Sequence, residues 1–443
     1  MMYTNKQLGK LLLPLLVEQT LSILVGMVDT VMVSSLGDAA ISGVSLVDQI
    51  AYVLIALFAA LATGGAVVAS QMLGADKRGE ACRVSNQLIM VVFLIAVVIT
   101  LALILLREQI FGLLFGGVEQ AVWDNAMTYL MITALSYPFI AVYNAGAALY
   151  RSMNRSGMTM IVSIVVNVTN ICGNALCLYG LGMGVAGVAI PTLISRGIGA
   201  LAMLGLMRNT HLQVHLLHGN WKPSMPIIRR IMHVGIPSGI ENSLFQLGRL
   251  LVVQVIARFG TVQTAANAVA NTLDTFGTLA GMTVNLAIIS VVGQCSGAGD
   301  FKQARYYTRK LLLWAYIGTA IIDIPILLGI DGILPLFDAS EDALALARTL
   351  VLIHNGSALL LWPMSFTLPN ALRAANDAKF TMVVALSSMA IFRIGFSYIL
   401  GLGLGWGAVG VWIAMIIDWC CRIVCYTTRY ASGKWEAKAR ITG

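Results

Sequence analysis

Long runs without a charged side chain recur along the chain, separated by short segments rich in lysine and arginine. Residues 49–75, 84–106 and 125–150 contain no Asp, Glu, Lys or Arg. Each run is long enough to cross a hydrocarbon core of roughly 30 Å as a helix. Residues 156–195 are also uncharged but are broken by Tyr179-Gly-Leu-Gly-Met-Gly184, where we expect a tight turn between two spans. Continued along the chain, this pattern predicts about twelve membrane-spanning segments.

Composition excludes an ordinary water-soluble protein. The chain has 443 residues, of which 58% are hydrophobic and 11% are charged, and its mean hydropathy is +0.84. A soluble protein of this length needs more charge on its surface. Helices are expected in lipid because they satisfy their own backbone hydrogen bonds, whereas a β-barrel shows short alternating segments. We therefore predict an all-α integral membrane protein, whose first apolar segment, residues 8–36, is a retained helix and not a signal peptide.

The basic residues are distributed as membrane topology requires. The net charge is +8, but most lysines and arginines fall in alternate loops, and the loops on the opposite side contain only Arg107, Arg258 and Arg348. This bias is the positive-inside pattern, which places both termini in the cytoplasm. It argues against a nucleic-acid partner, since the charge follows the loops and forms no single patch.

The second half of the chain repeats the first. A nearly constant shift aligns Pro14 with Pro237, Glu18 with Glu241, Gly37 with Gly260, Arg151 with Arg373, Asn154 with Asn376, and residues 180–190 with 403–413. We expect residues 1–215 and 216–443 to form two six-helix bundles. An even number of spans inserts both bundles in the same orientation, so they would be pseudo-symmetric about an axis along the membrane normal. Two such bundles around a central cleft suit alternating access.

Several motifs of this sequence resemble those of the multidrug and toxic compound extrusion (MATE) transporters. They are Pro14-Leu-Leu-Val-Glu18, Val28-Asp-Thr-Val-Met-Val33 followed by Leu36-Gly37, Gln71-Met-Leu-Gly74, Gly184-Val-Ala-Gly187, and Gln294-Cys-Ser-Gly297 in the second repeat. The resemblance covers almost the whole chain. It implies a secondary antiporter that expels organic cations in exchange for Na⁺ or H⁺, without a further cofactor. Related flippases of lipid-linked sugars share the architecture.

Two acidic residues in the first span are functional candidates, because a charge at bilayer depth costs at least about 2.5 to 3.5 kcal/mol. Glu18 and Asp29 lie three helical turns apart, and we expect them on one face. The resemblance places Asp29 at the family's helix-one aspartate, so we predict that Asp29 binds the coupling cation. The alternative is an aspartate that only faces a wet vestibule.

Three further polar residues are predicted to complete the coupling site: Asn170, Asn174 and Thr192. Asn170 and Asn174 are one turn apart on the same helix. Many members of the family carry an aspartate where this chain has Asn174, so one of the two carboxylates of such a proton site is missing here. Amide and hydroxyl oxygens can instead help to coordinate Na⁺. Hydrogen bonding between helices, without any ion, is the competing interpretation.

The second half has diverged at these positions, since Asp29 aligns with Val252 and Asn170 with Arg393. Arg393 should have an acidic partner among Glu241, Asp274 and Asp418. We assign six residues to the substrate cavity: Glu18, Glu241, Asp274, Arg393, Tyr137 and Tyr143. Aromatic faces attract cations, and a carboxylate released by Arg393 would be exposed to a cationic substrate. The alternative is that the pair made by Arg393 only fastens the helices together.

Three classes of function remain to be compared. The first is cation-coupled efflux by alternating access. The second is a flippase for a lipid-linked oligosaccharide or peptidoglycan precursor, which would need a cationic cavity, and Arg249 and Arg393 give it some support. The third is a membrane-embedded enzyme, for which the spans offer no catalytic constellation and no P-loop. We expect a non-enzymatic transporter, acting as a monomer in a bacterial plasma membrane.

Overall fold

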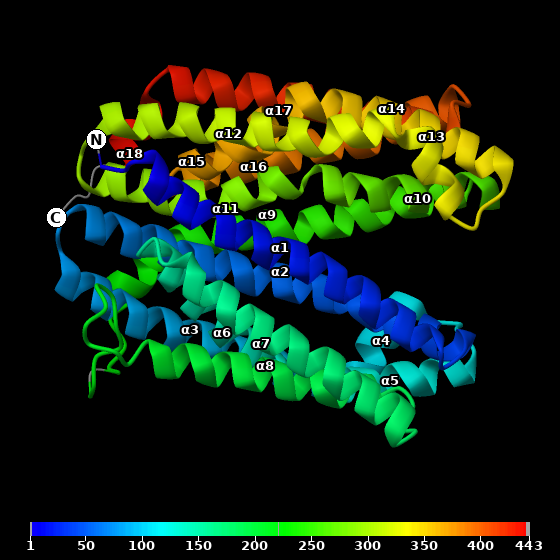
Figure 1. The fold of residues 1–443 in the computed structure, drawn as a ribbon, viewed down its shortest axis with the longest axis horizontal. Helices are drawn as coiled ribbons and strands as arrows, with labels where there is room; N and C mark the ends of the chain where they lie inside the picture. The colour runs from blue at the N-terminus through cyan, green and yellow to red at the C-terminus, as the bar shows by residue number, and fades with distance from the viewer. Residues whose placement is uncertain (1, 220, 440–443) are drawn as a thin grey trace. The chain divides into compact units, whose positions relative to one another are not determined.

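The structure is a computed structural model that describes residues 2–219 and 221–439, and all regular elements in these ranges are helices (Figure 1). Eleven helices are long and apolar enough to cross a membrane. A bent pair, Gln120–Ala134 and Tyr137–Ser152, meets at 47° and raises the number to twelve when it is counted as one span. The predicted all-α membrane fold is therefore confirmed.

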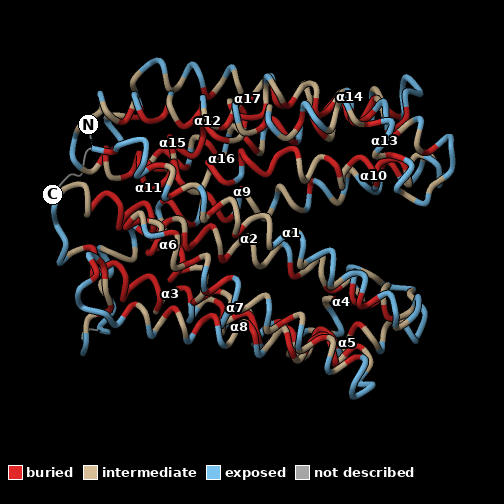
Figure 2. The backbone as a smooth tube through the Cα atoms, viewed as in Figure 1, coloured by how far each residue is buried: buried red, intermediate tan, exposed pale blue. Residues whose placement is uncertain are grey.

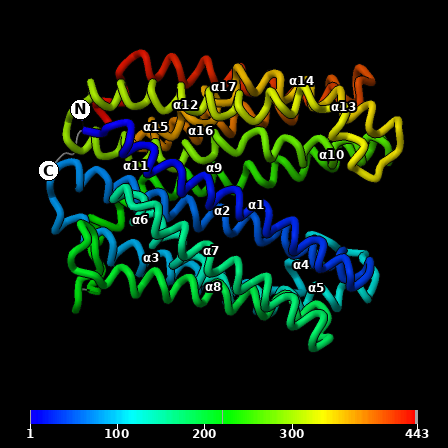
Figure 3. Tube along the Cα trace, in the orientation of Figure 1, coloured from blue at the N-terminus to red at the C-terminus, as the bar shows by residue number. Residues whose placement is uncertain are grey.

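The described residues divide into two compact units, at Gly239 and Ile240. The N-terminal unit holds α1 (Asn5–Ser34), α2 (Asp38–Gly74), α3 (Arg78–Leu105), α4 (Arg107–Phe115), α5 (Gln120–Ala134), α6 (Tyr137–Ser152), α7 (Ser156–Ala175) and α8 (Ala186–Leu206). A π-helical turn, Leu176–Gly180, ends α7. Figure 3 follows the chain through these helices. In this unit α1 packs against α7, and α6 packs against α2, α3 and α8.

The C-terminal unit begins within α9 (Met225–Ala257). It continues with α10 (Thr261–Gly277), α11 (Leu279–Gly297), α12 (Phe301–Leu328), α13 (Ile330–Ile333), α14 (Glu341–Trp362), α15 (Leu368–Ala374), α16 (Ala378–Ser388), α17 (Gly407–Ala431) and α18 (Lys434–Ala439). A short 3₁₀ segment covers Leu334–Leu336, and π-helical segments cover Pro363–Thr367, Met389–Gly395 and Ser397–Gly403. In this unit α11 packs against α12 and α15, and α10 packs against α14.

The helix ends repeat with the offset found in the sequence. Helix α2 covers residues 38–74, and α10 with α11 cover 261–297, each 223 positions later. Helix α3 covers 78–105 and α12 covers 301–328, again 223 positions later. The repeat therefore extends to helix length as well as residue identity. Within these helices the two copies differ at one place. Helix α2 of the first copy is continuous, whereas its counterpart in the second copy is interrupted at Thr278, between α10 and α11.

The backbone geometry of turns explains why two of the aligned residue pairs are identical in both halves. Gly37 and Gly260 have φ values of 94° and 102°, a region that side chains with a Cβ rarely adopt. Asn154 and Asn376 take the left-handed region at 59° and 64°, which asparagine tolerates better than most residues. Equivalent turns therefore impose the same residues on both halves.

Apolar side chains cover much of the outside of the helices, as lipid requires. Leu105, Leu328 and Leu360 are 75%, 82% and 73% exposed, although each is large and apolar. Figure 2 shows exposed positions along the outer helices and buried positions along inner ones such as α11. The hydrocarbon of a bilayer is the environment in which such surfaces are stable.

Candidate functional site

Four polar residues of the N-terminal unit meet at one place. Asp29 comes from α1, Asn170 and Asn174 from α7, and Thr192 from α8. The Asn174 amide donates to Asp29 Oδ1 at 2.8 Å and lies 3.3 Å from the Asn170 oxygen. Asn170 and Asn174 are buried. The structure thus brings together all four residues assigned from the sequence to the coupling site.

The Asn170 amide connects Asp29 with Thr192. One end of the amide lies 3.1 and 3.3 Å from the two Asp29 carboxylate oxygens, and its other end lies 3.1 Å from the Thr192 hydroxyl. Since Thr192 donates its proton to the Val188 carbonyl at 2.9 Å, its oxygen can accept from the amide nitrogen. The Asn170 oxygen then faces the carboxylate, and the Asn174 amide lies 2.8 Å from Asp29 Oδ1 and 3.3 Å from the Asn170 oxygen, so it can donate to both. After a 180° rotation the Asn170 nitrogen would donate to Asp29 instead.

The donor set fits a small hard cation. The cluster offers a carboxylate, two amide oxygens and a hydroxyl, and oxygen ligands of this kind suit such ions. The Asn174 Oδ1 atom is buried and accepts no hydrogen bond from the described residues. A buried acceptor without a donor is unfavourable, and a metal cation or a water molecule would satisfy it.

Sequence reasoning missed two charged neighbours of this cluster. Asp48 lies on α2, where the Tyr129 hydroxyl donates to it at 3.3 Å. Arg196 lies in the middle of α8, donates to Ser136 Oγ at 2.7 Å, and is close enough for its charge to act on Asp29 and Asp48. Both residues flank uncharged runs in the sequence, and neither was among the predicted site residues.

Glu18 belongs to a separate buried cluster of the same unit. Its carboxylate pairs with Arg151 of α6 at 3.5 Å and accepts from the Thr159 hydroxyl of α7 at 2.9 Å. The pair and the hydroxyl join three helices. Such an arrangement fastens α1 in place, and removing one partner would leave a buried charge uncompensated.

Glu241 makes the equivalent contacts in the C-terminal unit. It pairs with Arg373 of α15 and accepts from the Thr381 hydroxyl of α16 at 3.4 Å. Arg373 and Thr381 are the repeat counterparts of Arg151 and Thr159. The assignment of Glu18 and Glu241 to the substrate cavity stays a prediction, and their contacts in both units are those of structural ion pairs.

The acidic partner expected for Arg393 is Asp418. The Arg393 guanidinium lies 3.2 Å from one Asp418 oxygen, while Arg422 donates to the other at 2.9 Å. All three side chains are buried. Two arginines therefore share one carboxylate, and the group carries a net positive charge.

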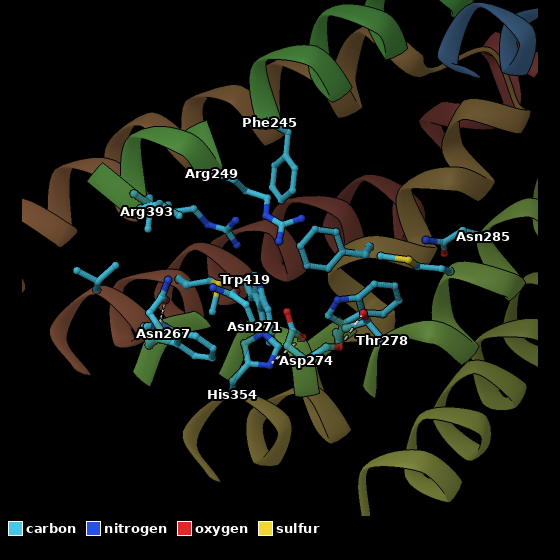
Figure 4. Close-up of a pocket in the computed structure, with 18 residues that line it drawn as sticks. Phe245, Arg249, Asn267, Asn271, Asp274, Thr278, Asn285, His354, Arg393 and Trp419 are labelled. Atoms are coloured by element: carbon cyan, nitrogen blue, oxygen red, sulfur yellow. Dashed lines mark hydrogen bonds and ion pairs between the residues drawn. The ribbon is translucent and has the colours of Figure 1, made fainter. Parts of the chain in front are cut away.

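A cavity of about 230 Å³ lies within the C-terminal unit (Figure 4). Two residues assigned to the substrate cavity from the sequence, Asp274 and Arg393, line it, together with Arg249 and His354. Its walls include four large aromatic side chains: Trp362, Phe366, Trp412 and Trp419. Concave sites with apolar walls and a few convergent polar groups are the usual places for small ligands.

A polar chain leads from this cavity to a buried carboxylate. Asp274 lies 3.1 Å from His354 Nδ1, whose ring packs edge-on against Trp412 and Trp419. The next residue, Asn355, donates to Asp323 Oδ1 at 2.8 Å. Asp323 is fully buried, and its second oxygen has no hydrogen-bond partner among the described residues.

Tyr137 and Tyr143 were also assigned to the substrate cavity, and both lie in the N-terminal unit. Tyr137 is fully buried near Phe58, with ring centroids 6.3 Å apart. Tyr143 packs against α8 at Gly199. They are packed among helices of their own unit, and their contact with a substrate stays a prediction.

The missing side chain at Gly281 leaves room for the Trp362 ring, which forms part of the cavity wall. A Cβ at this residue would overlap the Trp362 ring. We expect Gly281→Ala to displace Trp362 and to destabilise the protein by about 1–3 kcal/mol, as overpacking does. Thermal unfolding in detergent measures this, with Gly356→Ala as the control, because a Cβ there meets nothing within 4 Å. Equal midpoints for the two variants would contradict the assigned packing.

In the part of the chain that the structure describes, no group of three or more His, Cys, Asp and Glu residues could hold a metal ion. The histidines of the loop after α8 illustrate this. His215 contacts Cys82 Sγ at 3.6 Å and the Leu212 carbonyl at 3.3 Å.

Known proteins resemble the chain over nearly its whole length. The sequence profile of the MatE family matches residues 14–176 and 237–399, two segments that are 223 positions apart. The "Uncharacterized transporter YisQ" of Bacillus subtilis is 28% identical over 433 residues, covering 96% of this chain and 94% of that protein. The "Probable multidrug resistance protein NorM" of Thermotoga maritima is 24% identical over 445 residues, covering 99% and 94%.

Solved structures agree with this similarity. A crystal structure of MATE in complex with MaD3S has a TM-score of 0.90 at 21% identity, covering 98% of this chain and 96% of that one. At this identity the likeness establishes the fold alone. The double match to one profile confirms the internal repeat that was read from the sequence.

Proposed function

The chain belongs to the MatE family of membrane transporters, and we propose that it is a secondary active antiporter that exports organic cations in exchange for Na⁺ or H⁺. The names of relatives such as NorM support multidrug efflux. They do not favour the flippase alternative. The single observation that carries the coupling assignment is the meeting of Asp29, Asn170, Asn174 and Thr192 in one buried cluster.

Asp29 is proposed to bind the coupling cation, with the amide and hydroxyl oxygens as its neighbours. With a proton or Na⁺ present, the Asn170 oxygen can face the carboxylate. Without it, the rotated amide donates to the carboxylate, and its oxygen accepts from the Thr192 hydroxyl. Coupling then requires that the cation bind one transport state more tightly than the other, since equal affinities shift no equilibrium.

The repeat architecture supports alternating access as the transport mechanism. With six spans each, the two repeats would insert in the same orientation, as in other transporters that rock two similar bundles about a binding site. We place the protein in a bacterial plasma membrane, as a monomer with cytoplasmic termini. The bacterial relatives and the distribution of Lys and Arg among the loops support this placement.

Transport in proteoliposomes tests the proposal. We would follow ethidium movement by fluorescence, imposing a Na⁺ gradient and a proton gradient separately on the wild-type protein. The proposal predicts transport against the ethidium gradient with at least one of them, and the effective gradient names the coupling ion. If neither gradient moves ethidium or a panel of other organic cations, the proposed function is wrong.

The neutral ligands should set the affinity for the coupling cation. We expect Asn170→Ala and Thr192→Val to raise the cation concentration at half-maximal transport by about tenfold each, which corresponds to about 1.4 kcal/mol of lost interaction. Initial rates over a range of Na⁺ concentration or pH measure this. Asn167→Ala is the matched control, because Asn167 lies on α7 and its amide bonds only Ser163 among the described residues, at 3.4 Å. Unchanged half-maximal concentrations in both site variants would remove these residues from the site.

A further inference from the structure

A second pocket, of about 630 Å³, lies within the N-terminal unit and shares no residue with the cation cluster. Its lining comes from the first turns of α3, from the connection that follows α8, and from the first turns of α9. Figure 1 shows this connection at the end of the unit where α3 begins. The polar members of the lining are Glu80, Arg83, Gln87, Lys222, Ser224 and Arg230.

Buried amides of α3 hold the connection in place. The Gln87 side chain donates to the Lys222 carbonyl and accepts from the Ser224 N–H, each at 2.9 Å. The preceding Asn86 makes the same two kinds of contact with Leu217, both at 2.9 Å. Both amide side chains are buried. One wall of the pocket is therefore fixed in the absence of a ligand, which lowers the entropy cost of binding one.

The lining carries more positive than negative charge. Arg83, Lys222 and Arg230 are accompanied by a single carboxylate, that of Glu80, which pairs with Arg83 at 3.0 Å. The Lys222 side chain is exposed and makes no ion pair with another described residue. A negatively charged ligand group would reduce the repulsion among these cations.

The neighbouring sequence does not restore the balance of charge. Residues 205–240 contain no Asp or Glu, and Glu80 is the one acidic residue among residues 77–107. Asp76, in the turn before α3, already lies 3.7 Å from Arg78. The positive excess is therefore a property of both segments that form the pocket.

The pocket lies at the depth expected for lipid headgroups. Arg83 immediately precedes the uncharged run of α3, and Arg230 precedes the apolar part of α9. Trp221, next to Lys222, is 44% exposed, and Met225 in the lining is 69% exposed. Exposed tryptophan is typical of the interface between membrane and water. Apolar side chains that are open to the bilayer thus lie beside the basic group.

We propose that this pocket binds the headgroup of an anionic phospholipid, whose phosphate contacts Arg83, Lys222 and Arg230. Guanidinium groups form paired hydrogen bonds with phosphate oxygens, and basic pockets at the ends of membrane helices suit such headgroups. A free phosphate shares this chemistry, but the exposed Trp221 and Met225 favour a ligand with acyl chains. The proposal is independent of the proposed function, because it concerns neither the exported substrate nor the coupling cation.

Native mass spectrometry of the purified full-length protein in a non-ionic detergent tests the proposal. Phosphatidylglycerol and phosphatidylcholine with identical acyl chains would be titrated separately, and the dissociation constants of the first bound lipid compared. We expect phosphatidylglycerol to bind about tenfold or more tightly, because its headgroup alone has a net negative charge. Lys222→Gln should weaken phosphatidylglycerol about fivefold, which corresponds to about 1 kcal/mol for one basic residue, and leave phosphatidylcholine unchanged.

Lys77→Gln is the matched control, because Lys77 is also exposed and lies at the start of α3 outside the pocket lining. It should bind both lipids as the wild type does. An unfolding midpoint of Lys222→Gln equal to that of the wild type in lipid-free detergent would show that the weaker binding is not damage to the fold.

Inorganic phosphate, added as a competitor, distinguishes the two sources of a phosphate group. We expect it not to displace phosphatidylglycerol at a concentration near the dissociation constant of the lipid. Displacement at that concentration would overturn the proposal. Equal affinities for the two lipids, or equal weakening of phosphatidylglycerol by Lys222→Gln and Lys77→Gln, would also overturn it.

Discussion

Replacing Asp29 by asparagine is expected to abolish accumulation of substrate against its gradient, down to the level of liposomes without protein. Asparagine keeps the size of the side chain and an oxygen near Asn170, but it cannot hold a proton or balance the charge of Na⁺. Exchange of labelled for unlabelled substrate at equal concentrations should continue, because this exchange needs no coupling ion. Parallel measurements of accumulation and exchange in the same proteoliposomes check both expectations.

The control for this variant is Asp38→Asn, which removes an exposed carboxylate at the start of α2 and should transport as the wild type does. If Asp29→Asn still accumulated substrate, the coupling site would lie elsewhere. Loss of both accumulation and exchange would instead make Asp29 a structural or substrate-binding residue.

Replacing Asp418 by asparagine is expected to have the largest effect on stability. The change leaves Arg393 and Arg422, which are 4% and 2% exposed, without the carboxylate that they share. Breaking a buried ion pair by removing one partner costs about 3–5 kcal/mol, because the remaining charge is uncompensated. The thermal unfolding midpoint of the purified protein in detergent, followed by tryptophan fluorescence, should fall accordingly.

Asp331→Asn is the matched control, because Asp331 pairs with Arg348 at 2.7 Å on the exposed surface. Exposed pairs contribute little, so the midpoint at neutral pH should stay near that of the wild type. The Arg348 guanidinium lowers the pKa of Asp331 below its usual value of about 3.8. Any contribution of this pair to stability is therefore lost only as the pH falls below about 4. An Asp418→Asn variant as stable as Asp331→Asn would show that Asp418 does not balance the two arginines.

Span number, helical class and the repeat could be read from the sequence because they follow from averages over many residues. Uncharged runs of sufficient length must be helical in lipid, and the repeated turn residues Gly37 and Gly260 are imposed by backbone geometry. The interruption at Thr278 could not be read in this way. The residues around it, which include Asp274, Thr275 and Thr283, are more polar than the matching part of α2, but polarity alone does not determine whether a helix continues.

The candidate cation cluster was predictable because helix spacing and one motif fixed its members. Asn170 and Asn174 had to share a face, and the motif placed Asp29. The partner of Arg393 was left among three residues, since sequence does not give the rotation of one helix against another, and Asp418 lies on α17, far along the chain. Arg249 likewise could be placed at the cavity only in the structure.

The domain boundary shows the same dependence on packing. The polar segment between the repeats suggested a division after residue 215. The compact units of the structure divide at Gly239, within α9. Polarity marks where the chain leaves the membrane, whereas the contacts of a long helix change partway along it.

Direct cation binding by the purified protein in unbuffered nanodiscs tests the central claim, that Asp29 and its neighbours hold the coupling ion. Substrate-free wild type and Asp29→Asn would be titrated with Na⁺ while bound ²²Na⁺ and released protons are recorded together, and a separate acid titration would count the protons taken up. The account predicts saturable binding of Na⁺ or of a proton by the wild type that is missing in Asp29→Asn. Equal binding by the two proteins would contradict it.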